Sequence, residues 1–205
     1  MQSPHSKALG RTAAKLHLLS DQWASPSEFE RPHWDCQALM GDSPLWGRFW
    51  DCPGLSASDA MLFTQFREAA SAALNDVHDS LDMGLIHADL VRENVLLHPT
   101  DNNVVALIDF DDSVYGYRLF EIATALGKNV NEPQYLALRQ ALIEGYRELR
   151  AIDISALDLF MAIRAATYVG WSAERRAEPG GDARADRLVH AARVATMSWL
   201  RSAQT

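Results

Sequence analysis

Two short segments hold the polar residues whose types and spacing suit chemistry. Residues 85–97 read L-I-H-A-D-L-V-R-E-N-V-L-L, and residues 108–112 read I-D-F-D-D. Asp89 and Asn94 lie in a predicted loop, and Asp109 ends a predicted strand fifteen residues after Asn94. Two carboxylates and an amide oxygen that converge on one point are hard ligands of the kind that suits Mg²⁺. The carboxylate that does not hold metal can orient or deprotonate a hydroxyl nucleophile.

The order of these residues is typical of phosphoryl transfer. In that reaction one aspartate accepts the proton of the substrate hydroxyl, while an asparagine and a second aspartate hold the metal ions on the phosphates. The run H-x-D-x-x-x-x-N followed by I-D matches the kinase catalytic loop except at the residue after the histidine. The pattern predicts a kinase-type site that uses Mg²⁺, with ATP as co-substrate.

Short strands are expected to position these residues. Apolar runs rich in branched residues cover 84–87, 94–97 and 104–109, and the turn-forming stretch 99–103 makes the last two a predicted β-hairpin. Helical periodicity predicts helices near 6–22, 56–80, 118–127, 132–149, 154–176 and 182–202. The sequence therefore predicts an α+β, mainly helical fold whose few strands surround the chemistry.

Capping residues set the expected helix starts. Ser56 or Ser58 is expected to cap the second helix, Asn131 the fourth and Ser155 the fifth. In the first helix an apolar stripe runs from Leu9 to Ser20, and His17 lies beside it. We interpret His17 as a packed or surface histidine, because that is more common than a ligand in such a position. Between 25 and 55, prolines interrupt any long element, and we expect the aromatic residues to pin this connection to the core: Trp34, Trp46, Phe49 and Trp50.

The composition excludes several classes of protein. The chain has 205 residues, 48% hydrophobic and 22% charged, with a formal net charge of −8. That charge disfavours nucleic acid and anionic membranes as partners. The two cysteines, Cys36 and Cys52, are too few for a disulfide scaffold, and no apolar run has the length of a signal peptide or membrane span. A cytoplasmic location is the expectation.

The segments resemble the superfamily of aminoglycoside phosphotransferases, choline kinases and type II homoserine kinases. Residues 84–96 resemble its catalytic loop, with Ala88 where the family usually has glycine, and residues 108–112 resemble its metal-binding segment. Residues 116–123 and 9–17 are similar to the stretch after that segment and to the helix after the hinge. The resemblance implies a protein-kinase-like carboxyl-terminal lobe, one lobe over 1–205, with the nucleotide lobe absent.

The resemblance also implies a role for each residue. Asp89 would be the catalytic base, Asn94 and Asp109 the magnesium ligands, and His87 and Glu121 structural supports of the loop. Val91, where protein kinases have lysine, favours the small-molecule kinases. Two interpretations stay open for each of three further residues. Arg92 either contacts phosphate or forms a surface ion pair. Asp111 and Asp112 either contact phosphate or substrate or belong to a turn, and the turn is preferred for at least one of them.

Features expected of a nucleotide-binding lobe are missing from the sequence. There is no G-x-G pair, and the lysines, Lys7, Lys15 and Lys128, lie outside the predicted strands. Two hypotheses follow: the chain is the catalytic lobe of a small-molecule kinase, or it is a non-catalytic lobe that binds a ligand or protein. Either predicts an exposed apolar face, covered by a separate nucleotide-binding lobe or by a second copy.

The substrate class stays broad. Acidic residues of the helical region, Glu121, Glu144, Asp153 and Asp158, are compatible with an amine-bearing alcohol, such as an amino sugar, a choline-like compound or a hydroxy amino acid, and equally with solvated helix faces. The loop W-G-R-F-W at 46–50 favours the homoserine-kinase-like branch over the antibiotic-resistance enzymes.

Overall fold

The computed structural model describes residues 3–101 and 105–203 and divides them into two compact units. The first unit combines residues 3–33 with 82–157, and the second combines 34–81 with 158–203. Within the described ranges no helix is long and apolar enough to cross a membrane. The mainly helical character with small sheets agrees with the fold expected from the sequence.

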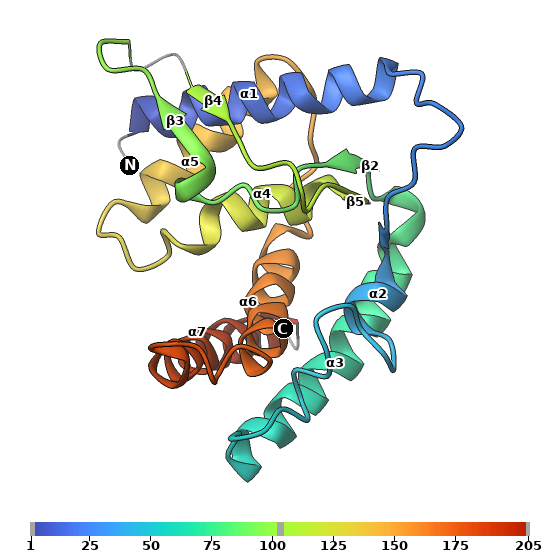
Figure 1. Cartoon of the computed structure of the whole chain (residues 1–205), viewed down its shortest axis with the longest axis vertical. Helices are drawn as coiled ribbons and strands as arrows, with labels where there is room; N and C mark the ends of the chain where they lie inside the picture. Colours follow the sequence, from blue (N-terminus) through green and yellow to red (C-terminus); the bar gives the residue numbers. More distant parts are fainter. Residues whose placement is uncertain (1–2, 102–104, 204–205) are drawn as a thin grey trace. The chain divides into compact units, whose positions relative to one another are not determined.

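The first unit is built on a pair of long helices. α1 (Ser3–Gln22) packs along α5 (Tyr135–Arg147) and also contacts β2 and β4 (Figure 1). Two glycines allow the helices to approach closely, because a Cβ on Gly10 would lie 2.0 Å from the Leu142 carbonyl oxygen and one on Gly145 would lie 2.0 Å from that of Lys7. The buried face of α1 includes His17 as well as Leu9 and Ala13, so His17 is part of the stripe that the sequence placed it beside.

Two small sheets carry the strands. β2 (Met83–Ile86) pairs antiparallel with β5 (Val114–Tyr117) in a three-stranded sheet of order β1-β5-β2, where β1 is His33–Trp34. β3 (Val95–Leu97) and β4 (Val105–Leu107) form the predicted hairpin. Val104, predicted to begin the second strand of that hairpin, lies outside the described residues, as do Asn102 and Asn103 of its turn.

α4 (Arg118–Gly127) follows β5 directly and has the predicted bounds. α5 begins at Tyr135 with Gln134 as its N-cap residue, so the prediction of an Asn131 cap is wrong. Backbone bonds from Glu132 to Asn129 and from Tyr135 to Glu132 close two successive turns before the helix, which is why it begins three residues later than predicted.

The second unit packs helices around aromatic side chains. It contains α2 (Cys36–Met40), α3 (Ala57–Val77), the 3₁₀ turn η1 (His78–Ser80), α6 (Leu157–Ala173) and α7 (Gly181–Ser202). Of the two serines expected as the cap of α3, Ser56 is the one that caps it, by accepting the Asp59 N–H at 3.1 Å. α6 begins at Leu157, because Ser155 bonds back to Asp153 instead of capping a helix.

The proline-broken connection is pinned by its aromatic residues. Trp34 and Phe49 are buried, and Trp34 meets Trp46 edge to face at 6.0 Å between ring centroids. Phe49 contacts Phe63 in the same manner at 6.2 Å. These contacts agree with the predicted role of the aromatic residues as packing anchors of the second unit.

Candidate active site

The candidate catalytic loop, residues 87–94, lies in the first unit between β2 and β3. The pairing of Ile86 with Val114 sets the end of β2 against the start of β5, and β5 leads directly into α4. The first turn of α4 carries Glu121. β5 ends beside Met83, at the start of β2, so α4 begins there, and its Glu121 reaches the loop that follows β2.

Glu121 is fully buried and binds the loop backbone with both oxygens. Its Oε1 accepts the N–H of His87 at 2.9 Å, and its Oε2 accepts the N–H of Ala88 at 2.8 Å. Burial works against ionisation, but the contact with His17 and the hydrogen bond from the His87 N–H outweigh it and lower the pKa of Glu121 below its ordinary value. The carboxylate thus satisfies two backbone donors that no strand pairs.

The backbone at Ala88 explains the usual glycine of the family pattern. Ala88 has φ of 68°, in the left-handed region, and is buried. A non-glycine residue in this conformation costs about 1 to 2 kcal/mol. The bond from its N–H to Glu121 offsets part of that cost, since it holds the turn in place.

His87 joins the catalytic loop to the metal-binding segment. Its Nδ1 accepts the N–H of Asp89 at 3.3 Å, and its Nε2 lies 2.9 Å from the Ile108 carbonyl oxygen. One accepting and one donating nitrogen is the neutral imidazole with the proton on Nε2. The ring also packs on Phe110, with 4.5 Å between centroids. These contacts give His87 the geometry of the structural support that the resemblance implied.

Asn94 fixes the orientation of Asp89. Its Nδ2 donates to the Asp89 carbonyl oxygen and to the Asp89 Oδ2, both at 2.9 Å. Its backbone carbonyl accepts the N–H of Ile108 at 3.1 Å. Since the nitrogen of the amide makes these bonds, its oxygen is left as a candidate ligand for a cation.

Asp109 follows Ile108 directly, so the two bonds that Ile108 makes to His87 and Asn94 hold Asp109 beside the loop. Asp109 is exposed and also has a left-handed backbone, with φ of 66°. The oxygen set of Asp89, Asn94 and Asp109 fits Mg²⁺, which binds through few protein groups together with water and substrate phosphates. Among residues 3–101 and 105–203, no three His, Cys, Asp or Glu side chains group in a way that could hold a metal ion.

Asp111 and Asp112 occupy the centre of a tight turn. Both are exposed, and the turn is closed by the Ser113 N–H, which donates to the Phe110 carbonyl at 3.1 Å. Arg31 also donates to the backbone carbonyl of Asp111 at 3.0 Å. The geometry agrees with the turn interpretation of these two residues.

Arg92 pairs with the segment after α4. Its Nη2 donates to Asn129 Oδ1 at 2.8 Å and lies 3.3 Å from Glu132 Oε1. The guanidinium is 42% exposed, so the pair is a surface ion pair of modest strength. Arg92 thus forms the ion pair that one of its two interpretations describes, and the contact with phosphate stays a prediction.

Behind the loop, the sequence analysis named His17 only as a packed or surface histidine and did not name Tyr146. His17 Nε2 lies 3.5 Å from Glu121 Oε1, and His17 Nδ1 lies 2.8 Å from the Tyr146 hydroxyl, with all three side chains fully buried. Their separation along the chain gives no spacing signal. The one available signal is that His17 lies next to an apolar stripe, where a buried histidine requires polar partners.

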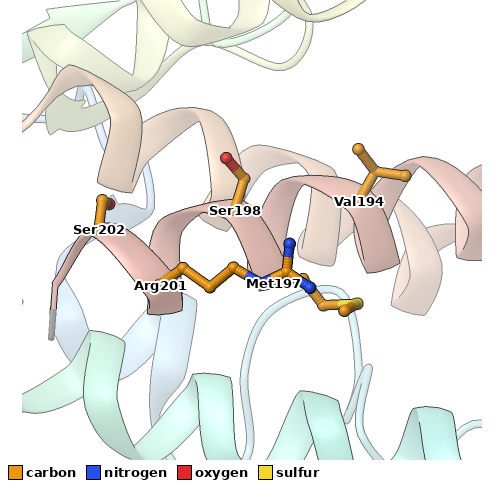
Figure 2. Close-up of a pocket in the computed structure, with 5 residues that line it drawn as sticks. All are labelled: Val194, Met197, Ser198, Arg201 and Ser202. Atoms are coloured by element: carbon orange, nitrogen blue, oxygen red, sulfur yellow. The ribbon is translucent and has the colours of Figure 1, made fainter.

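A hollow lies away from these residues, on the surface of α7 in the second unit. Figure 2 shows the five residues that line it: Val194, Met197, Ser198, Arg201 and Ser202. It has a volume of about 570 Å³ and brings together two hydroxyls, one guanidinium and no carboxylate. That set has neither a general base nor metal ligands, and the candidate site stays with the first unit.

Comparison with known proteins agrees with this geometry. Residues 5–160 match the model of the phosphotransferase enzyme family. The chain belongs to that family. The match covers both the catalytic loop and the metal-binding segment, so the resemblance expected from those motifs is confirmed.

Relatives within the family include small-molecule kinases. A homoserine kinase of Neisseria meningitidis is 29% identical over 147 residues, which make up 70% of this chain and 44% of that protein. An uncharacterized protein of Deinococcus radiodurans is 31% identical over 188 residues, 87% of this chain and 52% of the relative. A solved structure of a microcompartment-associated aminopropanol kinase superposes with a TM-score of 0.86 at 27% identity, over 98% of this chain and 64% of that one. The chain spans about half the length of the curated relatives it matches.

Proposed function

We propose that this chain carries the catalytic base and metal ligands of an ATP-dependent small-molecule kinase. The observation that carries the proposal is the braced loop: Glu121 holds its backbone, Asn94 orients Asp89, and His87 ties it to the segment of Asp109. Family membership and the kinase relatives support the same reaction. The proposed product is the phosphate ester of a small hydroxyl compound.

In the proposed reaction, Asp89 accepts the proton of the substrate hydroxyl as its oxygen attacks the γ-phosphorus of ATP. The bond from that phosphorus to the bridging oxygen breaks, and ADP leaves. Asn94 and Asp109 would hold Mg²⁺, which neutralises phosphate charge when bound. The bonds from Asn94 Nδ2 keep the Asp89 carboxylate in one orientation, so that little reorganisation is needed during proton transfer.

The proposed substrate class is an amine-bearing alcohol. An aminopropanol kinase and a homoserine kinase are among the proteins similar to this chain, and their substrates combine an amine and a hydroxyl. An amino sugar, a choline-like alcohol and a hydroxy amino acid all belong to this class. The substrates to test first are 1-amino-2-propanol, ethanolamine, choline and homoserine.

We also propose that a separate nucleotide-binding lobe, or a second copy of the chain, covers the exposed apolar side chains beside the site. These side chains lie on β3 and on the segment after β4: Leu96, Leu97, Ile108 and Phe110. The three lysines lie on α1 and just after α4, and none is on a strand where it could contact ATP phosphates as in protein kinases. Such a lobe would supply the phosphate-binding lysine and glycine loop.

The position of the three lysines outside the strands also supports a second candidate function, a non-catalytic module that binds a ligand or protein. Nucleotide binding separates the two. Mg·ATP at 100 times its Kd should stabilise a competent chain by about 2.7 kcal/mol. No shift in Tm at millimolar Mg·ATP, with the fold intact and the amino-terminal region of the aminopropanol-kinase relative present, would favour the module.

The experiment that tests the kinase proposal measures ADP formation with each of the four alcohols, Mg²⁺ and ATP. The chain is assayed alone and together with the amino-terminal region of its aminopropanol-kinase relative. Asp89→Asn should abolish turnover with little change in Tm, because Asp89 is half-buried and the asparagine keeps its shape. An Asp89→Asn variant that turns over normally would remove Asp89 from the role of base. The matched control is Asp101→Asn, an exposed aspartate in the turn that follows β3.

A further inference from the structure

Behind the candidate catalytic loop, three fully buried polar side chains form a line across the first unit. The Tyr146 hydroxyl lies 2.8 Å from His17 Nδ1, and His17 Nε2 lies 3.5 Å from Glu121 Oε1. The same Oε1 accepts the N–H of His87. The line therefore runs from α5 through α1 to the backbone of the loop.

The protonation of the line follows from burial. Burial raises the pKa of the Tyr146 hydroxyl, so the hydroxyl keeps its proton. The Glu121 carboxylate that faces His17 Nε2 can only accept, so Nδ1 of a neutral ring is the nitrogen that accepts from the Tyr146 hydroxyl. Burial lowers the pKa of His17, even though the facing Glu121 carboxylate favours the charged ring, and Arg118 and Arg150 add to the lowering. A neutral ring that accepts at Nδ1 carries its proton on Nε2, the nitrogen that faces Glu121.

The position of His17 is itself fixed by packing. The close approach of α1 and α5 at Gly10 and Gly145 sets how far His17 lies from Tyr146. On the same helix, Ser20 Oγ donates to the Leu85 carbonyl at 3.2 Å, in the strand that leads into the loop. α1 is thus anchored both to the loop's strand and, through His17, to the acid beneath the loop.

We propose that His17 and Tyr146 are positioning residues for the catalytic loop, acting through Glu121. Tyr146 selects the ring tautomer, and the Nε2–H of His17 then faces the oxygen that binds the His87 N–H. If the tautomer were reversed, a lone pair of the ring would face the carboxylate and push it away from the loop. The consequence for catalysis rests on the proposed kinase function, whereas the consequence for loop order does not.

Loop order is tested by hydrogen exchange at the His87 and Ala88 amides of the full chain. Tyr146→Phe removes a single oxygen and should speed exchange at both amides about five- to tenfold, the equivalent of one hydrogen bond. His17→Leu should give at least that increase, while His17→Gln, whose amide nitrogen can reach Glu121, should recover most of the protection. Ring ¹⁵N shifts of His17 should report the Nε2–H tautomer in the wild type and a tautomer mixture in Tyr146→Phe.

The matched control is Thr124→Val, which removes another buried hydrogen bond of α4, from Thr124 Oγ1 to the Phe120 carbonyl at 2.9 Å. It should lower global stability without selectively exposing the two loop amides. Equal exchange at these amides in Thr124→Val and Tyr146→Phe would overturn the proposal, as would an Nδ1–H tautomer in the wild type.

Kinetics separate this proposal from the kinase proposal. In an active preparation, Tyr146→Phe should lower kcat about three- to tenfold and leave the KM for ATP within about twofold, since it moves the base and not the nucleotide contacts. An unchanged kcat would overturn the catalytic half of the inference. If the wild-type protein turns over none of the alcohols, the kinase proposal fails by itself, and exchange and ring shifts still decide whether His17 and Tyr146 position the loop.

Discussion

The catalytic loop and the metal-binding segment lie next to each other, but different contacts hold each of them in place. Each contains a non-glycine residue in the left-handed region, Ala88 in the loop and Asp109 in the segment. Ala88 is buried and its N–H is bound by a buried carboxylate. Asp109 is exposed, and its exposed neighbours Ile108 and Phe110 lie on either side of it. The loop is held from the interior, while the segment is held from the loop.

This difference gives the site an order of dependence. Ile108 is bound by the His87 ring and by the Asn94 carbonyl, so the segment takes its position from the loop. The loop takes its position from α4 through Glu121. Damage to the brace should therefore disturb both parts, and damage to the link should disturb the segment alone.

The largest expected effect comes from removing the brace. Glu121→Ala leaves two loop N–H groups and His17 without their buried partner and should lower the free energy of unfolding by about 3 to 5 kcal/mol. Urea denaturation measures it. Glu132→Ala, which breaks only the exposed pair with Arg92, should cost less than about 1 kcal/mol and is the control. Similar losses in the two variants would remove Glu121 from the role of brace.

A smaller and more local effect is expected from breaking the link. His87→Leu should lower stability by about 2 kcal/mol, because the Asp89 N–H and the Ile108 carbonyl lose their partner. Amide exchange should accelerate more at Ile108, which loses one of its two bonds to the loop and keeps the bond from its N–H to the Asn94 carbonyl, than at Ala88, whose bond to the buried Glu121 is untouched. The opposite ranking would reverse the inferred order of dependence.

The buried pair of His17 and Glu121 should also make the free energy of unfolding depend on pH. The pKa of His17 is lowered in the folded protein from 6.5, so the unfolded chain binds more protons below neutrality. The stability from neutral His17 is complete above about pH 6.5 and falls with pH by up to about 1.4 kcal/mol per unit. Below about pH 4.5 the lowered pKa of Glu121 adds a further loss in the same direction. Tm values from pH 8 to 5 should fall less in His17→Gln than in Thr124→Val; parallel curves would contradict the assignment.

The smallest effects compare the two strained backbones. Asp109→Gly should raise stability by about 0.5 kcal/mol, because glycine relieves a positive φ at an exposed position where no buried methyl is lost. Ala88→Gly should be close to neutral, since the relief is offset by the loss of a buried methyl group and by greater chain entropy. Paired urea titrations measure both. A loss of stability in Asp109→Gly would show that the aspartate side chain supports the fold.

The sequence predicted the features that depend on residues close along the chain. In the site these are the hairpin, the bounds of α4 and the resemblance that points to Glu121, and in the second unit a serine cap at the start of α3. The pairing of β2 with β5 went unpredicted, because the whole hairpin intervenes between the two strands. The start of α5 was predicted wrongly because asparagine is a common N-cap residue and Asn131 stands at the right place. In the structure Asn129 and Glu132 bind Arg92 and close turns before the helix, so the helix begins later.

The sequence could not predict the buried polar contacts behind the site for a related reason. Arg118 is buried at the start of α4 and pairs with Asp21 and Asp82, which approach from two distant segments. A Cβ on Gly84 would lie 2.1 Å from the Arg118 Nη2, so the glycine that opens the motif makes room for that side chain. Periodicity reports which face of an element is apolar, but it carries no information about which buried polar groups from separate elements meet.

The helix pair of α1 and α5 has a consequence for synthesis of the chain. α1 ends at Gln22, whereas α5, on which it packs through Gly10 and Gly145, ends only at Arg147. At about 5 to 20 residues per second, translation takes roughly 5 to 25 s between these points. During that interval the face of α1 that packs on α5 lacks this partner, although β2 and β4, which α1 also contacts, are made earlier. A ribosome-associated chaperone that binds short apolar helices would therefore meet this protein first at α1, and slower translation before residue 135 would lengthen that exposure.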